Sequence, residues 1–221
     1  MKNIKKWHDT IIIGMLVLSL FIMSYNIYAV NNALNIKQQN NSIIGNIIST
    51  QPKIIDVRPK GIPPIYGAEL NVNFDDISST DSQKVNLIIN KIGSLENNIV
   101  LTASEKNRYI KIVSLISCEY CCGAESIIFS NGDPACGCSH SAAMRGIAKY
   151  LIKYHSNDYS DDQILEELGK WKTLFFPTAI GAKAVILKEK GIEINYINLA
   201  SNKYRGIETS ITSASEMVGG C

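Results

Sequence analysis

Residues 118–140, CEYCCGAESIIFSNGDPACGCSH, hold five of the six cysteines of the chain. Their potential ligands form a Cys-x-x-Cys-Cys cluster and a Cys-x-Cys-x-His cluster: Cys118, Cys121 and Cys122, then Cys136, Cys138 and His140. Between the clusters, residues 126–129 have a β-type composition, and Asn131-Gly132 is a strong two-residue signal for a hairpin turn. A hairpin about that turn brings the second cluster back to the first. The stretch therefore predicts one site formed from both clusters.

Thiols and an imidazole grouped in this way are typical ligands of zinc, copper(I) and iron–sulfur centres. Zinc takes four such ligands at ~2.0 to 2.3 Å from the ion. The spacing predicts a metal site with zinc as the first choice, and with copper or an iron–sulfur centre as the other candidates. The first-choice ligands are Cys118, Cys121, Cys136 and Cys138, with Cys122 and His140 as alternates.

Two other interpretations of the cysteines stay open at this point. In an oxidising compartment the same residues are expected to form disulfides, and the sequence does not select a pairing. A thiol–disulfide redox protein is the third interpretation. It is less favoured, because such a motif belongs at a strand end that opens a helix, whereas residues 118–121 are expected to close one. Cys221, near the end of the sequence, has no assigned role.

The segments around the cysteines have helical periodicity. Apolar residues recur every three and four positions in 81–93, from Thr102 or Ser104 to beyond Ile116, and in 139–154, 160–176 and 179–190. Extending the second of these by one turn places the first cysteine cluster on the end of a helix, and residues 192–199 alternate enough for a strand. The fold class predicted is mainly α, a small bundle of four to five helices with one short β-hairpin at the cysteine site.

The N-terminal part predicts a membrane segment. Residues 11–30 contain no charge, and at 1.5 Å per residue they match the roughly 30 Å hydrocarbon core of a bilayer. The lysines before them predict a single-pass protein with its N-terminus in the cytoplasm and its domain outside. Cleavage of residues 1–29 as a signal peptide, giving a secreted protein, is the alternative. The predicted division is 1–30 anchor or signal, 31–80 Asn- and Pro-rich spacer, 81–200 helical domain, and 201–221 polar tail.

Charge and motif content exclude several classes of protein. The formal net charge is +2, and residues 31–221 carry 19 basic and 19 acidic groups, so no electrostatic footprint for nucleic acid is present. No Ser-His-Asp set, phosphate-binding glycine loop or pair of carboxylates stands out, so no catalytic residue is assigned and an enzyme is not indicated. The functional alternative to metal binding is an interaction module, stapled by disulfides, that binds an unidentified protein partner through the face of Trp171.

Residues 135–141, ACGCSHS, carry a short resemblance to a known group. They resemble the Cys-Gly-Cys followed by His of bacterial PCYCGC-motif proteins, although the first Pro-Cys-Tyr part of that motif is missing here. The resemblance covers about seven residues. It implies an exported, metal-linked protein, and it carries over only Cys136, Cys138 and His140.

Overall fold

The computed structural model of the chain describes residues 23–30, 54–77, 80–208 and 217–219. The chain divides into two compact units, Met1–Gln51 and Pro52–Cys221. In the first unit, residues 23–30 are helical and exposed. The second unit contains all six cysteines, and Cys221 lies outside the described residues.

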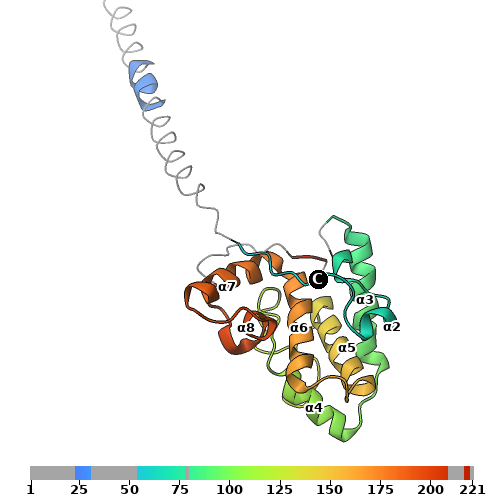
Figure 1. Cartoon of the computed structure of the whole chain (residues 1–221). Coiled ribbons are helices and arrows are strands. Elements are labelled where there is room, and N and C mark those ends of the chain that lie inside the picture. The colour runs from blue at the N-terminus through green and yellow to red at the C-terminus, as the bar shows by residue number, and fades with distance from the viewer. Residues whose placement is uncertain (1–22, 31–53, 78–79, 209–216, 220–221) are drawn as a thin grey trace, which may run out of the picture. The chain divides into compact units, whose positions relative to one another are not determined.

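The second unit is built from helices joined by loops. In chain order they are α2 (Tyr66–Glu69), η1 (Phe74–Asp76), α3 (Ser82–Asn98), α4 (Ala103–Val113), α5 (Ser139–Tyr154), α6 (Asp161–Phe175), α7 (Pro177–Glu189), α8 (Tyr196–Ala200) and η2 (Asn202–Tyr204). The central helix α5 packs against α3 and α6, and α4 contacts both α5 and α6 (Figure 1). The short α8 packs on α6 and α7. The prediction of a mainly helical protein is confirmed.

The prediction of a β-hairpin at the cysteine site is wrong. The described residues contain no strand, only two isolated antiparallel bridges, Ile116–Ser201 and Ile128–Pro134. A turn does form here, with Gly132 at φ 88° and its N–H bonded to the Phe129 carbonyl at 2.9 Å, so its central residues are Ser130 and Asn131, one position earlier than predicted. The ladder does not continue past the Ile128–Pro134 bridge, because the Ile127 N–H donates to the Ile116 carbonyl at 3.2 Å and not to the facing arm.

Capping residues near in sequence determine the start of some helices, whereas the end of α3 was not predicted by the glycine in its sequence. Thr102, one of the two predicted start residues, caps α4 in a capping box with Glu105. The expected end of α3 at Gly93 is wrong, since the helix continues to Asn98. At Gly93 the helix meets α5, where an added Cβ would lie 3.5 Å from Ala142.

The predicted strand at residues 192–199 is also wrong, because α8 begins inside it. Asn195 caps this short helix, and its side chain accepts a hydrogen bond from the Asn198 N–H at 2.8 Å. A short polar side chain in this position favours a helix start over an extended chain. The alternation of apolar residues that suggested a strand was therefore the weaker of two signals.

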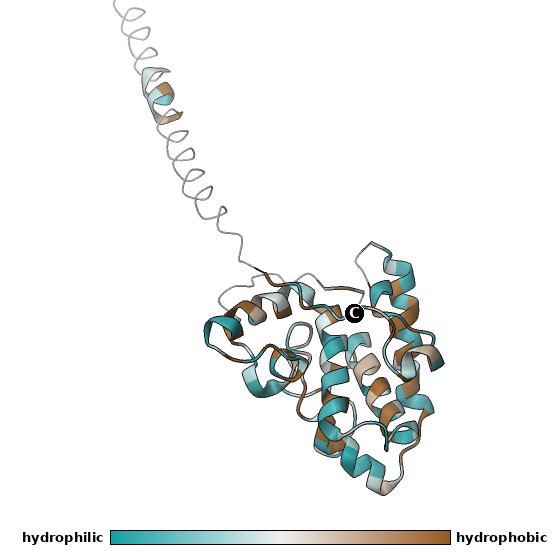
Figure 2. Ribbon diagram, viewed as in Figure 1, coloured by the Kyte–Doolittle hydropathy of each residue, from teal (hydrophilic) through white to brown (hydrophobic). Residues whose placement is uncertain are grey.

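Amphipathic helices enclose one continuous apolar core. Figure 2 shows hydrophilic and hydrophobic residues on the same helices, as expected when one face of each turns inward. Trp171, Phe175 and Phe176 are fully buried in this core. The core extends to the cysteine site, where Cys118 and Cys136 are buried with it.

The prediction of a membrane helix over residues 11–30 has to be corrected. None of the helices in the described part of the chain combines the length and the apolar character needed to cross a bilayer. The described helical stretch at 23–30 covers only about 12 Å at 1.5 Å per residue, and residues 11–22 lie outside the described residues. On this finding the prediction of a single-pass membrane protein is wrong.

Candidate functional site

Three cysteine sulfurs gather at one point of the second unit. The Sγ atoms of Cys118, Cys136 and Cys138 all lie within 4.8 Å of one another, and those of Cys118 and Cys138 are 3.4 Å apart. Two thiolates on one tetrahedral zinc ion lie about 3.8 Å apart, given Zn–S bonds of about 2.3 Å. These three cysteines could therefore hold a metal ion with small shifts of their side chains.

Cys136 also takes part in a second arrangement. It forms a disulfide with Cys122, across a Cα–Cα distance of 6.8 Å. Cys118, Cys121 and Cys138 are thiols. A sulfur in a disulfide cannot serve as a thiolate ligand. The Cys122–Cys136 disulfide and a three-cysteine metal site therefore exclude each other.

The first cysteine cluster lies on a turn, not on a helix end as the sequence suggested. Helix α4 ends at Val113, and the chain then turns about the Cys118 carbonyl. This oxygen accepts N–H groups from Cys121, Cys122 and Gly123 at 3.4, 3.3 and 3.2 Å. Gly123 has φ 68°, which favours glycine. The turn directs Cys122 to Cys136.

The second cluster opens a helix. Cys138 is the N-cap of α5, and its Sγ accepts a hydrogen bond from the Ser141 N–H at 3.4 Å. The short contact with Cys118 lowers the pKa of Cys138, helped by hydrogen bonds from His140 and Ser141. The same contact, together with burial, raises the pKa of Cys118. These opposite shifts favour the proton on Cys118 over Cys138.

A buried arginine fixes the loop that carries Cys136. Arg145 on α5 forms a two-pronged ion pair with Glu96 of α3, at 2.7 and 2.9 Å. Its Nη1 also donates to the carbonyls of Ile127 and Cys136, at 3.0 and 2.9 Å. Arg145 is 2% exposed and holds the Cys136 loop through these hydrogen bonds.

His140 does not belong to the three-cysteine group. Its ring is buried and packs on Phe175 and Phe176, with centroids 4.6 and 5.2 Å away. Its Nε2 lies 2.9 Å from the Val218 carbonyl. A carbonyl can only accept, so this nitrogen carries a proton and donates. His140 also forms a hydrogen bond with Cys138, so it contacts a candidate metal ligand and is not one of the three grouped residues.

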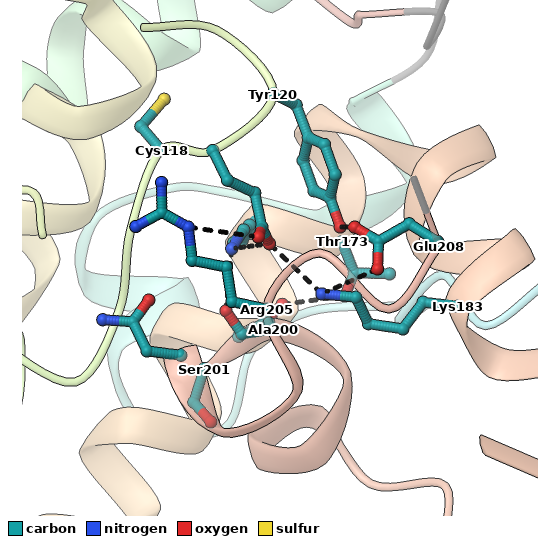
Figure 3. Close-up of polar contacts among 12 residues, drawn as sticks. Cys118, Tyr120, Thr173, Lys183, Ala200, Ser201, Arg205 and Glu208 are labelled. Carbon is teal, nitrogen blue, oxygen red and sulfur yellow. Dashed lines mark hydrogen bonds and ion pairs between the residues drawn. The ribbon is translucent and has the colours of Figure 1, made fainter. Parts of the chain in front are cut away.

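Next to Cys118 lies a buried network of charges (Figure 3). Its members are Glu119, Tyr120, Lys172, Lys183, Arg205 and Glu208. Lys172 and Lys183 have no exposed side-chain surface and share one Glu119 oxygen, at 2.8 and 3.2 Å. Burial lowers the pKa of Lys172 to about 8, against the attraction of Glu119. Burial alone would raise the pKa of Glu119, but the two lysines outweigh it and the pKa is lowered.

The network holds the cysteine turn at three points. The two lysines bind Glu119, and Tyr120 donates to Glu208 at 2.6 Å. Arg205 donates to the Gly123 carbonyl at 2.7 Å. The sequence analysis did not identify these residues. A signal was present, since Lys183 is a single charge within the run Ala179–Leu187 of α7, which is otherwise apolar or small.

The structure thus brings the two predicted cysteine clusters together, but the cysteines that contact one another differ from the four first-choice ligands. It groups Cys118, Cys136 and Cys138, and it brings Cys122 to Cys136 where the sequence preferred Cys121. Cys121 is exposed and outside the three-cysteine group. Whether any of the six predicted ligands binds a metal stays a prediction.

Comparisons with protein-family models, with curated proteins and with solved structures gave no match. The resemblance to PCYCGC-motif proteins therefore stays a prediction. The arrangement of the cysteine sulfurs is therefore the basis for assigning a function.

Proposed function

We propose that the reduced protein binds one soft metal ion through the thiolates of Cys118, Cys136 and Cys138. The observation that carries this proposal is the gathering of these three sulfurs within 4.8 Å. Thiolate ligands favour zinc, copper(I) or iron–sulfur centres over hard ions such as magnesium. Zinc is the first choice, because it accepts sulfur ligands in tetrahedral sites and needs no redox chemistry.

The ion in this site is exchangeable rather than a structural lock, which fits a carrier or a sensor. A structural zinc site is closed by four protein ligands, whereas three sulfurs meet here. Cys138 is partly exposed, and its neighbour Gly137 is exposed. Most of the apolar core consists of aliphatic and aromatic side chains of the long helices, although Cys118 and Cys136 also belong to it. Loss of the metal is therefore expected to leave the helices folded.

The buried cations support an anionic centre at this place. Lys172, Lys183 and Arg205 face two carboxylates, so the network carries one net positive charge. A divalent ion with three thiolates carries one net negative charge. Cys118 is also among the groups that raise the pKa of Lys172 against its burial. The net positive charge of the network would therefore favour an anionic centre beside it.

Metal analysis of the full-length protein tests the proposal. The protein is reduced, given excess zinc and freed of unbound metal by gel filtration, and about one zinc per chain is expected. Cobalt(II) should give the thiolate-to-metal absorption of a sulfur-rich site. Cys136→Ser and Cys138→Ser should lose the metal, whereas the exposed neighbour Cys121→Ser should keep it. Reduced wild-type protein without bound metal, or a Cys121→Ser variant as deficient as Cys136→Ser, would refute the proposal.

A second candidate function is a disulfide-stabilised interaction module, which the Cys122–Cys136 bond favours. A bridge across a separation of 14 residues stabilises a fold by about 3 kcal/mol in the chain-entropy description. If this is the only role of the cysteines, reduction should lower the free energy of unfolding by about that amount, and zinc should not restore it. Restoration of stability by zinc would favour the metal site instead.

A further inference from the structure

Cys136 belongs to two arrangements that cannot exist together. With Cys118 and Cys138 it forms the three-sulfur group, and with Cys122 it forms a disulfide. We propose that the metal site is redox-gated: oxidation of Cys122 and Cys136 to their disulfide expels the ion, and reduction restores the site. This inference rests on the proposed function and adds its regulation.

The placement of Cys122 suits a gate. Its side chain is exposed, whereas Cys136 is only 6% exposed. The turn about the Cys118 carbonyl holds Cys122 near the site, and its sulfur contacts that oxygen at 3.7 Å. An oxidant from solution therefore reaches Cys122 first. Cys121 is equally exposed and adjacent in sequence, but the turn does not direct it to Cys136.

The chemical step is a thiol–disulfide exchange with a low-molecular-weight disulfide as the oxidant. The Cys122 thiolate attacks one sulfur of this disulfide, whose S–S bond breaks and releases the first thiol. Cys136 then attacks the Cys122 sulfur of the mixed disulfide, and the second thiol leaves. Cys122 and Cys136 lose two electrons and the external disulfide gains them. The two leaving thiolates take up two protons, one from Cys122 and one from solvent.

The ion leaves because the remaining sulfurs hold it poorly. Once Cys136 is in the disulfide, only Cys118 and Cys138 of the three-sulfur group remain. Two protein ligands are fewer than the three or four that hold zinc in catalytic and structural sites. Arg145 keeps its hydrogen bond to the Cys136 carbonyl, so the backbone stays in place for reloading.

Zinc release measured together with disulfide mapping tests the gate. Full-length reduced protein, loaded with zinc, is treated with oxidised glutathione, and free zinc is followed with a chromophoric chelator. Wild-type protein should release about one zinc per chain, in step with the Cys122–Cys136 bond found by mass spectrometry. Cys122→Ser should release zinc at least about tenfold more slowly, because the direct exchange route is lost. Cys121→Ser, the matched control, should behave as wild type.

Several outcomes overturn the gate while leaving metal binding intact. Zinc that stays bound after the Cys122–Cys136 bond has formed would do so. The gate is also refuted if Cys122→Ser releases zinc at the wild-type rate. It is refuted as well if wild-type protein releases zinc while a Cys118–Cys138 bond forms in place of the Cys122–Cys136 bond. If Cys122→Ser fails to fold, the wild type still decides, since a dithiol should restore zinc uptake as the bond is reduced. Reduced wild-type protein that takes up no zinc removes the proposed function itself.

Discussion

Arg145 allows the sharpest test of how the fold builds the cysteine site. In the variant Arg145→Met, the Glu96 carboxylate loses its partner, and the carbonyls of Ile127 and Cys136 lose their donor. The side chains of Arg145 and Glu96 are 3% and 9% exposed. Removing one partner from a buried ion pair costs about 3 to 5 kcal/mol, because the other charge stays buried and unpaired.

The double variant Glu96→Gln, Arg145→Met separates stability from function. Because Glu96→Gln removes the buried unpaired charge, the free energy of unfolding of the double variant should return to within about 2 kcal/mol of wild type. The Cys136 carbonyl still lacks its donor, however, so the Cys136 loop stays loose. Zinc binding should therefore remain weakened in the double variant although its fold is recovered.

Urea denaturation followed by circular dichroism measures the first effect, and zinc titration of the reduced variants measures the second. The exposed pair Arg58–Asp56, with about half of each side chain accessible, provides the control. Arg58→Met should change stability by less than about 1 kcal/mol. The reasoning is refuted if Arg145→Met is as mild as this control, or if the double variant is no more stable than Arg145→Met alone.

Three further predictions concern other parts of the second unit. His155 is held by Glu69 and Asp158 at 2.8 and 3.0 Å; burial alone would lower its pKa, but these carboxylates raise it. Its stabilising contribution is complete below the unfolded pKa and is lost as the pH rises through the folded one, so stability should fall from about pH 6.5 upward. His155→Gln should flatten this part of the denaturation profile, and an identical slope in wild type and variant would contradict the prediction. Lys172→Met should weaken zinc binding about tenfold, or about 1.4 kcal/mol, because the network loses its net positive charge, whereas Lys172→Arg keeps this charge and should weaken binding less. Equal zinc affinities of wild type and Lys172→Met would contradict this prediction. Gly146→Ala should destabilise the fold by about 1 to 3 kcal/mol, because its Cβ would collide with a backbone carbonyl of α3; a variant with an unchanged urea midpoint would disprove close helix packing there.

Features that depend on neighbouring residues in sequence could be predicted, and features that depend on distant ones could not. The capping boxes at Thr102 and Ser160 are local, and both exist in the structure. Helix α3 continues through Gly93 to Asn98 and packs along α5, so the glycine alone was a misleading stop signal. Likewise the buried ion pair of Arg145 requires a partner 49 positions away, which no local pattern indicates.

The cysteine site shows the same limit at finer scale. The meeting of the two clusters followed from the turn predicted at Asn131-Gly132, and the structure contains a turn one position earlier. The choice of Cys122 over Cys121 as partner of Cys136 depended on a turn about the Cys118 carbonyl, which replaced the expected helix end. Adjacent cysteines point in different directions on a turn and on a helix. The sequence could therefore predict the site but not which sulfur faces which.

The charge carried by the sulfurs links the two proposed states to the same fold. In the metal-bound state, a divalent ion and three thiolates carry one net negative charge. In the disulfide state, the opposite pKa shifts of Cys118 and Cys138 favour one proton between the two sulfurs, and so also one negative charge. The buried network, with its one net positive charge, is therefore matched in both states. Because a buried unmatched charge is costly, this equality lets the site load and empty without rearranging α6 and α7. Amide hydrogen exchange in these helices should then be the same in both states, and a large difference would show that the network responds to the ion.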